Sequence, residues 1–154
     1  MKKFIVFIFL AGCLGCTGFV KLKARDSIFD LSGVKKVCLV CEEELEEMES
    51  VRCGDYVFNY CSLDIAKEKY DALSTKGVQL YFEEVDLDEF LDELFKQLKI
   101  EVVSESHVKE ISILQCYTPY FQDCVYIDNK KVNVQIATTS EGVIAGFPMI
   151  LTGF

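Results

Sequence analysis

The sequence predicts an α+β fold in which a largely antiparallel sheet carries two or three helices on one face. Two observations lead to this prediction. In the first half of the chain, β-rich runs alternate with helical patterns, whereas from residue 100 onward β-rich runs follow one another directly. Such strands pair antiparallel through short turns, and the helices of the first half then cover one face of the sheet. At 154 residues the chain has the size of one domain.

The first 20 residues form a membrane-targeting pattern. Lys2 and Lys3 precede the apolar block FIVFIFLA, whose length is typical of a signal-peptide core. Residues 10–13 (LAGC) resemble the bacterial lipobox, in which Cys13 would become the lipidated N-terminus. Residues 1–20 are therefore interpreted as a signal peptide or membrane anchor, with the remainder of the chain on the extracytoplasmic side of the cell membrane.

Two alternatives for this segment stay open. The run from residue 4 to residue 20 is almost continuously apolar and reaches the lower length limit of a spanning helix, so an uncleaved anchor also fits. Cleavage after a small residue without lipidation would instead release the protein.

A short connector is expected before the folded domain. Residues 21–32 are polar without periodicity, which leaves residues 33–154 as a single α+β domain. Within it, residues 34–40 predict a strand because they are rich in β-branched residues. The acidic run EEELEEME at residues 42–49 predicts a short helix, since acids suit the positive end of the helix dipole.

The next elements are predicted from turn and capping signals. Residues 51–53 and 56–61 are β-rich runs around a Gly-Asp turn, which indicates a hairpin. The Ser-Leu-Asp triplet that follows supplies a cap for a helix over residues 65–73. Residues 78–83 alternate between apolar and polar as a strand does.

The clearest helix is predicted at residues 87–98, where Asp86 is the N-cap. Six apolar side chains fall at helical spacing and form one stripe. They are Leu87, Phe90, Leu91, Leu94, Phe95 and Leu98. This stripe must pack on a sheet or on other helices, while the acidic residues of the same segment form a solvated face.

The second half of the chain is predicted as a meander of strands. The strands are expected at residues 100–106, 107–118, 124–128, 130–139 and 142–151. Asp128-Asn129 and Glu141-Gly142 mark turns between them.

The charge of the chain excludes several classes of partner. The formal net charge is −9, and beyond the leader the longest basic runs are the lysine pairs at 35–36 and 130–131. Because a protein that neutralises phosphates needs a basic face, no nucleic-acid partner is expected. An anionic membrane surface and strongly negative substrates are disfavoured for the same reason.

Cysteine is the most informative residue type. Six of the eight cysteines follow the leader, namely Cys38, Cys41, Cys53, Cys61, Cys116 and Cys124. The sequence favours free thiols buried as small apolar side chains, because several lie in apolar strand contexts. Disulfides are the second interpretation, since one pair flanks the predicted hairpin and the last two cysteines have the same spacing.

The third interpretation gives cysteine a chemical role. Cys38 and Cys41 form a CxxC at the predicted junction of a strand and a helix, where a helix N-terminus lowers the thiol pKa. Together with Cys53 and Cys61 they form a four-thiolate set for zinc. Three glutamates directly after Cys41 oppose a thiolate, and the second pair lacks the short spacing typical of zinc sites.

The rest of the sequence predicts neither an enzyme nor a cofactor. His107 is the only histidine, so histidine-based triads and multi-histidine metal sites have little to work with. The acidic runs lack the loop spacing of a calcium site, and neither glycine-rich phosphate motif occurs.

Three short motifs stand out near the C-terminus: YTP at residues 117–119, KVNVQIA at 131–137 and GFPMI at 146–150. With them, residues 115–154 resemble the end of the YwmB-like family of Firmicute proteins, called TATA-box-binding-protein-like. The resemblance implies an envelope or sporulation context. It assigns no activity and no residue role, and the family name describes a fold similarity rather than DNA binding.

Asn133 and Gln135 are the candidate interaction residues of this stretch, because they share one face of a predicted strand whose other face is apolar. Polar residues that face solvent over a buried face are the favoured interpretation, since alternating strands normally have this pattern. The alternative is a polar platform for a partner.

The sequence thus predicts an extracytoplasmic, membrane-tethered protein that is a non-enzymatic interaction module. Its expected partners are the membrane, through the N-terminal segment, and another envelope protein. The alternative is a thiol–disulfide redox or zinc-binding protein that uses Cys38 and Cys41.

Overall fold

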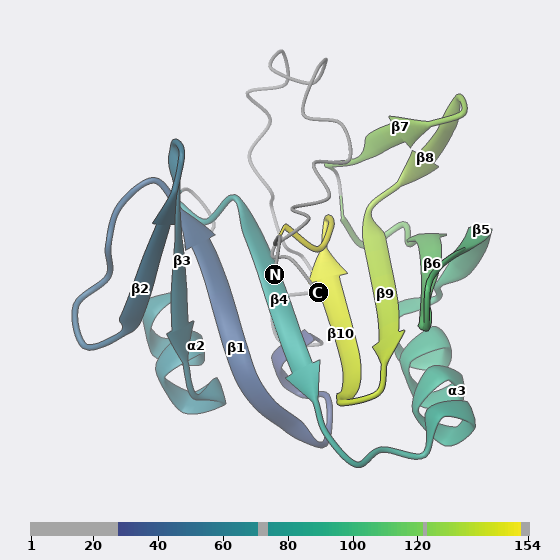
Figure 1. Ribbon diagram of the computed structural model, residues 1–154, viewed down its shortest axis with the longest axis horizontal. Helices are drawn as coiled ribbons and strands as arrows, with labels where there is room; N and C mark the ends of the chain where they lie inside the picture. Colours follow the sequence, from purple (N-terminus) through teal and green to yellow (C-terminus); the bar gives the residue numbers. More distant parts are fainter. Residues whose placement is uncertain (1–27, 71–73, 122, 152–154) are drawn as a thin grey trace.

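The computed structural model describes residues 28–70, 74–121 and 123–151, so the leader with Cys13 lies outside the described residues. Their main feature is an eight-stranded sheet in which all neighbouring strands are antiparallel (Figure 1). The strand order is β2-β3-β1-β4-β10-β9-β6-β5. The elements are β1 (Val34–Cys41), β2 (Glu49–Cys53), β3 (Tyr56–Cys61), α2 (Leu63–Lys69), β4 (Gly77–Phe82), α3 (Leu87–Leu98), β5 (Glu101–Val108), β6 (Ile111–Tyr117), β7 (Val125–Ile127), β8 (Lys130–Val132), β9 (Val134–Thr139) and β10 (Gly142–Phe147). The predicted α+β fold with a largely antiparallel sheet is confirmed.

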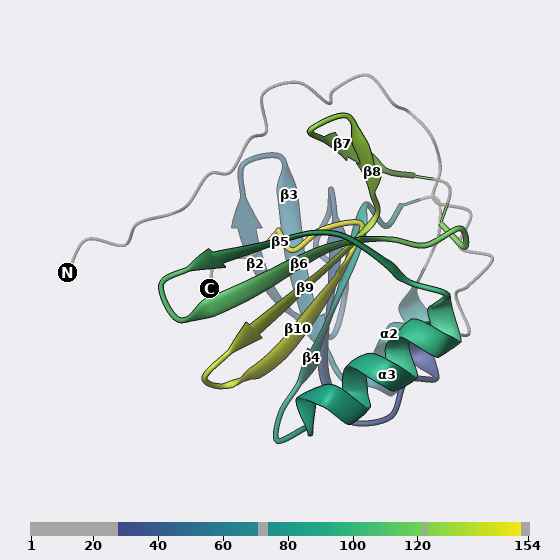
Figure 2. The ribbon, with the colours of Figure 1, turned by 90° about the vertical axis from the view of Figure 1, so that its right-hand side faces the viewer.

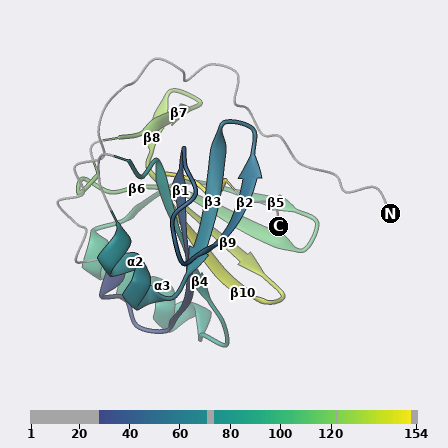
Figure 3. The ribbon, with the colours of Figure 1, turned by 90° about the vertical axis from the view of Figure 1, so that its left-hand side faces the viewer.

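Helices α2 and α3 lie on the same side of the sheet (Figures 2 and 3). Alternate residues of the central strands face them, for example Leu39 of β1, Leu80 of β4 and Ile136 of β9, all fully buried. Leu94 and Leu98 of α3 are fully buried against this face as well. The core of the domain is therefore the layer between the helices and one face of the sheet.

The domain begins earlier than the sequence predicted. Ile28, Phe29 and Leu31 are all buried and belong to the core under the helices. The ring of Phe29 makes an edge contact with Tyr70, with centroids 5.5 Å apart. The interpretation of residues 21–32 as a polar connector is therefore wrong from Ile28 onward. The sequence pattern does not reveal this, because the few apolar side chains of this segment lie among polar residues and show no periodicity.

The helix predicted at residues 42–49 is absent, because residues 42–48 form the loop between β1 and β2 and Glu49 begins β2. The buried side chain of Asn59 holds the loop in place. Its Oδ1 accepts from the N–H of Leu45 at 2.9 Å, and its Nδ2 donates to the carbonyl of Glu43 at 3.2 Å. These partners satisfy backbone groups that a helix would otherwise pair internally, so the acidic run needs no helix.

The remaining elements of the first half agree with the prediction in type. The Gly-Asp turn joins β2 to β3, with Gly54 at φ 63°. Ser62 caps α2, although this helix ends at Lys69 rather than near residue 73. Asp86 caps α3 by accepting from the N–H of Glu89 at 3.1 Å, and α3 has the predicted bounds. Neither α2 nor α3 has the length and hydropathy to span a membrane, and the described residues contain no other candidate span.

The second half is the predicted meander, with three differences, one of which is that the strand predicted at residues 142–151 ends at Phe147. The strand predicted at residues 130–139 is broken at Asn133, so that β8 pairs with β7 in a small separate sheet while β9 joins the main sheet. The turn between β5 and β6 falls near Lys109, whose φ is 57°, and His107 therefore lies inside β5 rather than at a strand start. Asp128 and Asn129 form the predicted turn with positive φ.

Candidate functional site

We call the face of the sheet opposite α2 and α3 the open face. Along β1, Val37, Leu39 and Cys41 belong to the core under the helices, whereas Cys38 and Val40 belong to a separate cluster. Because successive side chains of a strand point to opposite faces, the register of the sheet assigns every other residue to the open face. The candidate site lies on this face.

A row of uncharged residues crosses the open face from strand to strand. Directly opposed residues of antiparallel strands share a face, and the pairings link one residue from each of seven neighbouring strands. This polar row consists of Tyr60, Cys38, Gln79, Gly146, Gln135, Gln115 and Ser104. Within it, Ser104 Oγ donates to Gln115 Oε1 at 2.6 Å, and the side chain of Gln79 hydrogen-bonds the Cys38 thiol.

The chain's own C-terminal segment lies across the polar row. We call residues 148–151, which follow the end of β10, the closing segment. The N–H of Ile150 donates to Gln135 Oε1 at 3.1 Å, and the N–H of Leu151 donates to Gln79 Oε1 at 2.7 Å. Both glutamines are buried. A buried carbonyl oxygen without a hydrogen-bond donor is destabilising, and the closing segment provides the donor for the side-chain oxygens of both glutamines.

Two glycines form the floor beneath the closing segment. A Cβ built on Gly146 would lie 2.4 Å from the carbonyl carbon of Met149 and 2.5 Å from the nitrogen of Ile150, which no real side chain tolerates. A Cβ built on Gly77 would lie 3.7 Å from Leu151 Cδ1 and 3.8 Å from the Cβ of Val40. The backbone of the closing segment therefore approaches the sheet at Gly146, and the side chain of Leu151 lies over Gly77.

The CxxC does not form a dithiol site. Cys38 and Cys41 both lie inside β1, three residues apart, so their side chains point to opposite faces of the sheet. Burial raises the pKa of the Cys38 thiol to about 12, and the hydrogen bond with Gln79 only partly offsets this. The predicted position at a strand–helix junction is wrong because the loop that follows β1 is not a helix.

The other cysteines are also separate. Cys53 opposes Tyr56 at one end of the β2–β3 hairpin, whereas Cys61 lies at the other end and opposes Val37, so the hairpin brings no disulfide pair together. None of the six cysteines of the described residues is assigned to a disulfide bond. No group of three or more potential metal ligands occurs among the described residues. Of the cysteines, Cys38, Cys41 and Cys116 are buried as the favoured interpretation requires, Cys61 and Cys124 are partly buried, and Cys53 is exposed.

Asn133 and Gln135 are not the surface residues that the sequence predicted. Asn133 is fully buried and Gln135 is 8% exposed, so neither faces solvent or offers a free platform. The amide of Asn133 accepts from the N–H of Thr118 and donates to the carbonyls of Thr118 and Phe121 at 2.8 and 3.1 Å. The hydroxyl of Thr118 in turn donates to the carbonyl of Leu98 at the end of α3. Asn133 thus joins the loop after β6 to the break between β8 and β9.

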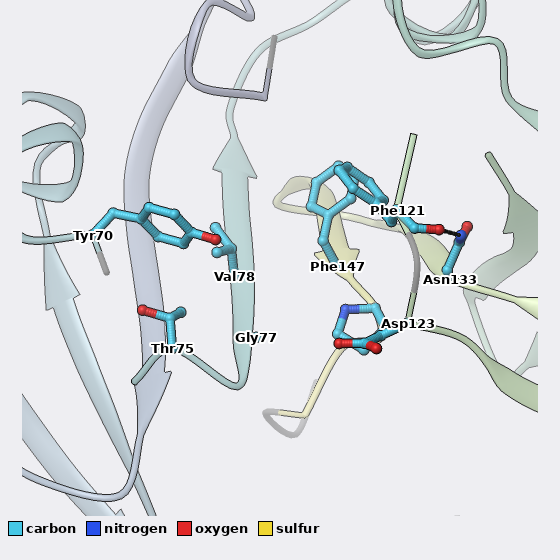
Figure 4. Close-up of a pocket in the computed structure, with 9 residues that line it drawn as sticks. Tyr70, Thr75, Gly77, Val78, Phe121, Asp123, Asn133 and Phe147 are labelled. Carbon is cyan, nitrogen blue, oxygen red and sulfur yellow. Dashed lines mark hydrogen bonds between the residues drawn. The ribbon is translucent and has the colours of Figure 1, made fainter. Parts of the chain in front are cut away.

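A small hollow lies beside the closing segment and has room for about one water molecule. Figure 4 shows Tyr70 and Thr75 on one side of β4 and the rings of Phe121 and Phe147 together on the other. Burial raises the pKa of Asp123 in its lining. The hollow offers no pair of groups placed to act together on a substrate. His107 lies elsewhere, exposed on β5, with its Nε2 3.4 Å from a carboxylate oxygen of Glu105.

The sequence analysis missed Gln79, Gly146 and the closing segment. Two local signals could have indicated them. Gln79 is the only amide side chain in the strand GVQLYF, and a glycine inside a strand often marks the close approach of another backbone. Strand β10 contains such a glycine at position 146.

Fold and site together define an α+β domain whose antiparallel sheet is covered by helices on one face and crossed by the chain's own C-terminal segment on the other. Comparison of the chain with protein-family models, with curated proteins and with solved structures found no match.

Proposed function

We propose that this protein is an extracytoplasmic, membrane-tethered interaction module without catalytic activity, and that it contacts another envelope protein through the open face of its sheet. The observation that carries the proposal is the uncharged polar row, in a chain of net charge −9, with the charged residues Glu49 and Lys36 only beside its Tyr60 end. An uncharged strip with aromatic neighbours on an acidic protein has the composition of an interface core, which is depleted of charge.

Aromatic residues in the polar row and next to it support this proposal. Tyr60 and Tyr81 lie with ring centroids 6.4 Å apart, and the ammonium of Lys36 lies 4.2 Å from the centroid of Tyr60. Phe58 and Val51 oppose each other on the neighbouring strands, and the side chain of Val51 is 52% exposed. Tyrosine is enriched at interfaces because it supplies contact area and a polar group together.

The leader supports the location. Lys2, Lys3 and the apolar block are typical of exported proteins, and Cys13 fits the lipidated position. Ile28 is already part of the core, so the chain between Cys13 and the domain spans at most about 50 Å when extended. A lipid on Cys13 would hold Ile28, where the described domain begins, within this reach of the membrane surface. The resemblance of residues 115–154 to the YwmB-like family supports an envelope or sporulation context.

The location is tested in living cells by mass spectrometry of the membrane fraction. We expect a diacylated N-terminal Cys13 in the native chain and loss of the lipid in the Cys13→Ala variant. A protein recovered from the cytosol with an intact Met1 would contradict the proposed location. The same sample identifies an uncleaved anchor, which would keep Met1 in the membrane fraction.

The interaction is tested with a photo-reactive amino acid placed in the native chain. At Val51, beside the open face, we expect a cross-link to a second envelope protein. At Asp88, an exposed residue of α3 on the helix side, we expect none. Equal cross-linking at the two positions would show that the open face is not the contact surface.

A further inference from the structure

The polar row binds the closing segment mainly through its backbone. The two hydrogen bonds run from consecutive N–H groups, of Ile150 and Leu151, to the side-chain oxygens of Gln135 and Gln79. Every residue except proline provides such an N–H, so these two bonds do not depend on the bound sequence. Selectivity comes instead from the space over Gly77 and beside Val40, which the side chain of Leu151 fills.

The sheet does not need the closing segment for its own hydrogen bonds. The pairings of β10 with β4 and with β9 are complete across the polar row, with Gly146 opposed to Gln79 on one side and Gln135 on the other. The closing segment itself is only partly buried, and Leu151 is 37% exposed. Release of these few residues therefore leaves the ladder intact and uncovers two carbonyl acceptors and an apolar floor.

We propose that the polar row, together with Gly77 and Val40, is a peptide-binding site that the closing segment occupies in the free protein and that an apolar segment of the partner occupies in the complex. This inference rests on the proposed function and names how the partner is recognised. The partner segment has two successive free N–H groups, hence no proline at those two positions, and a leucine-like side chain at the second. It is uncharged, because the row provides no charged group to pair with it.

The test uses the full mature chain and a fluorescent peptide with the sequence of residues 148–154, PMILTGF. In the native chain the closing segment competes at a high effective concentration, so the peptide binds weakly. Leu151→Asp puts a carboxylate over the apolar floor and releases the segment. We expect this variant to bind the peptide at least about tenfold more tightly than the native chain does, as measured by fluorescence anisotropy.

Two controls separate the site from unspecific binding. Val108→Asp changes an aliphatic residue with the same exposed fraction, 37%, near the tip of the β5–β6 hairpin, and is expected to bind like the native chain. A peptide that is N-methylated at the residues equivalent to Ile150 and Leu151 lacks both donors and is expected to lose at least about tenfold in affinity. If Leu151→Asp binds no better than Val108→Asp, or if N-methylation has no effect, the proposal is overturned.

A second measurement covers the case in which Leu151→Asp does not fold. Amide hydrogen exchange of the native chain is followed by NMR with an excess of the peptide. Displacement of the closing segment is expected to speed the exchange of the Ile150 and Leu151 amides, and unchanged exchange overturns the proposal. If exchange is unchanged but Val51 still cross-links to an envelope protein, the peptide site is refuted and the proposed function stands. If the peptide binds as expected but the protein is recovered from the cytosol, the proposed function is refuted and the peptide site stands.

Discussion

The two faces of the same sheet are specified in different ways. The helix-covered face is filled by interchangeable aliphatic and aromatic side chains, such as Leu39, Leu80 and Leu94, whose contribution scales with buried area. The open face depends on individual groups, because Gln79, Gly146 and Gln135 each make one specific contact with the closing segment. Changes on the covered face should therefore lower global stability, whereas changes on the open face should act on the position of a single segment.

The largest effect is expected on the covered face. Leu94→Ala removes a fully buried side chain of α3 and leaves a cavity in the core. We expect the free energy of unfolding to fall by about 3 to 4 kcal/mol, as measured by urea denaturation. A loss below about 1 kcal/mol would mean that the helix layer is not the main source of stability. It would contradict the expectation that changes on the covered face lower global stability most.

Gly146→Ala tests the open face. The added Cβ cannot coexist with Met149 and Ile150 in their present positions, so the closing segment must move. We expect a loss of about 2 kcal/mol in the free energy of unfolding, together with fast amide exchange at Ile150 and Leu151. Slow exchange at both amides in this variant would show that the segment is held by something other than the contact at Gly146.

Buried thiols on the two faces are expected to make the stability of the protein depend on pH. Burial raises the pKa of Cys38, on the open face, and of Cys116, in the core, to about 12 from an ordinary value of 9.0. Both thiols stay protonated in the folded chain while the unfolded chain ionises them. Their stabilising effect is therefore complete below pH 9 and is lost as the pH rises toward 12.

The corresponding measurement is urea denaturation between pH 9 and pH 11. Each thiol is expected to contribute a fall of about 1.4 kcal/mol per pH unit, so Cys38→Ala and Cys116→Ala should flatten the alkaline slope equally. If only Cys116→Ala flattens the slope, the pKa of Cys38 is not raised. Water would then reach the Cys38 thiol, and the open face would be less well sealed at this position than the burial of Cys38 indicates.

The smallest effect is expected at the caps of the two covering helices. Asp86→Ala removes the acceptor for the N–H of Glu89 at the start of α3, and we expect a loss of about 1 kcal/mol. Ser62→Ala, at the start of α2, should cost less because its hydrogen bond is long, at 3.5 Å. Thermal denaturation of both variants compares the two caps, and the reverse order would contradict this account of the helices.

Elements defined by neighbouring residues could be predicted from the sequence. Helix α3 follows from Asp86 and an apolar stripe at helical spacing, and the β2–β3 hairpin follows from two β-rich runs around a turn. These signals are local, because each element pairs its backbone within a few residues of itself.

Elements defined by distant side chains could not be predicted. The loop at residues 42–48 has the composition of a helix start, but it is fixed by Asn59, which lies 14 residues beyond Leu45. The strand predicted at residues 142–151 stops at Phe147, because the chain beyond it bonds to Gln79, which lies 72 residues from Leu151. No local pattern records a bond over that separation, so the sequence could at most mark Gln79 and Gly146 as unusual strand residues and could not show that the closing segment bonds to this part of the sheet.

The most direct test of the central claim is an NMR measurement of distances in the full chain with labelled methyl groups. If the closing segment lies across the polar row, the Leu151 methyl protons must give strong nuclear Overhauser effects to the Gly77 α-protons. Leu151 methyl groups without these contacts would show that the open face does not bind the C-terminal segment.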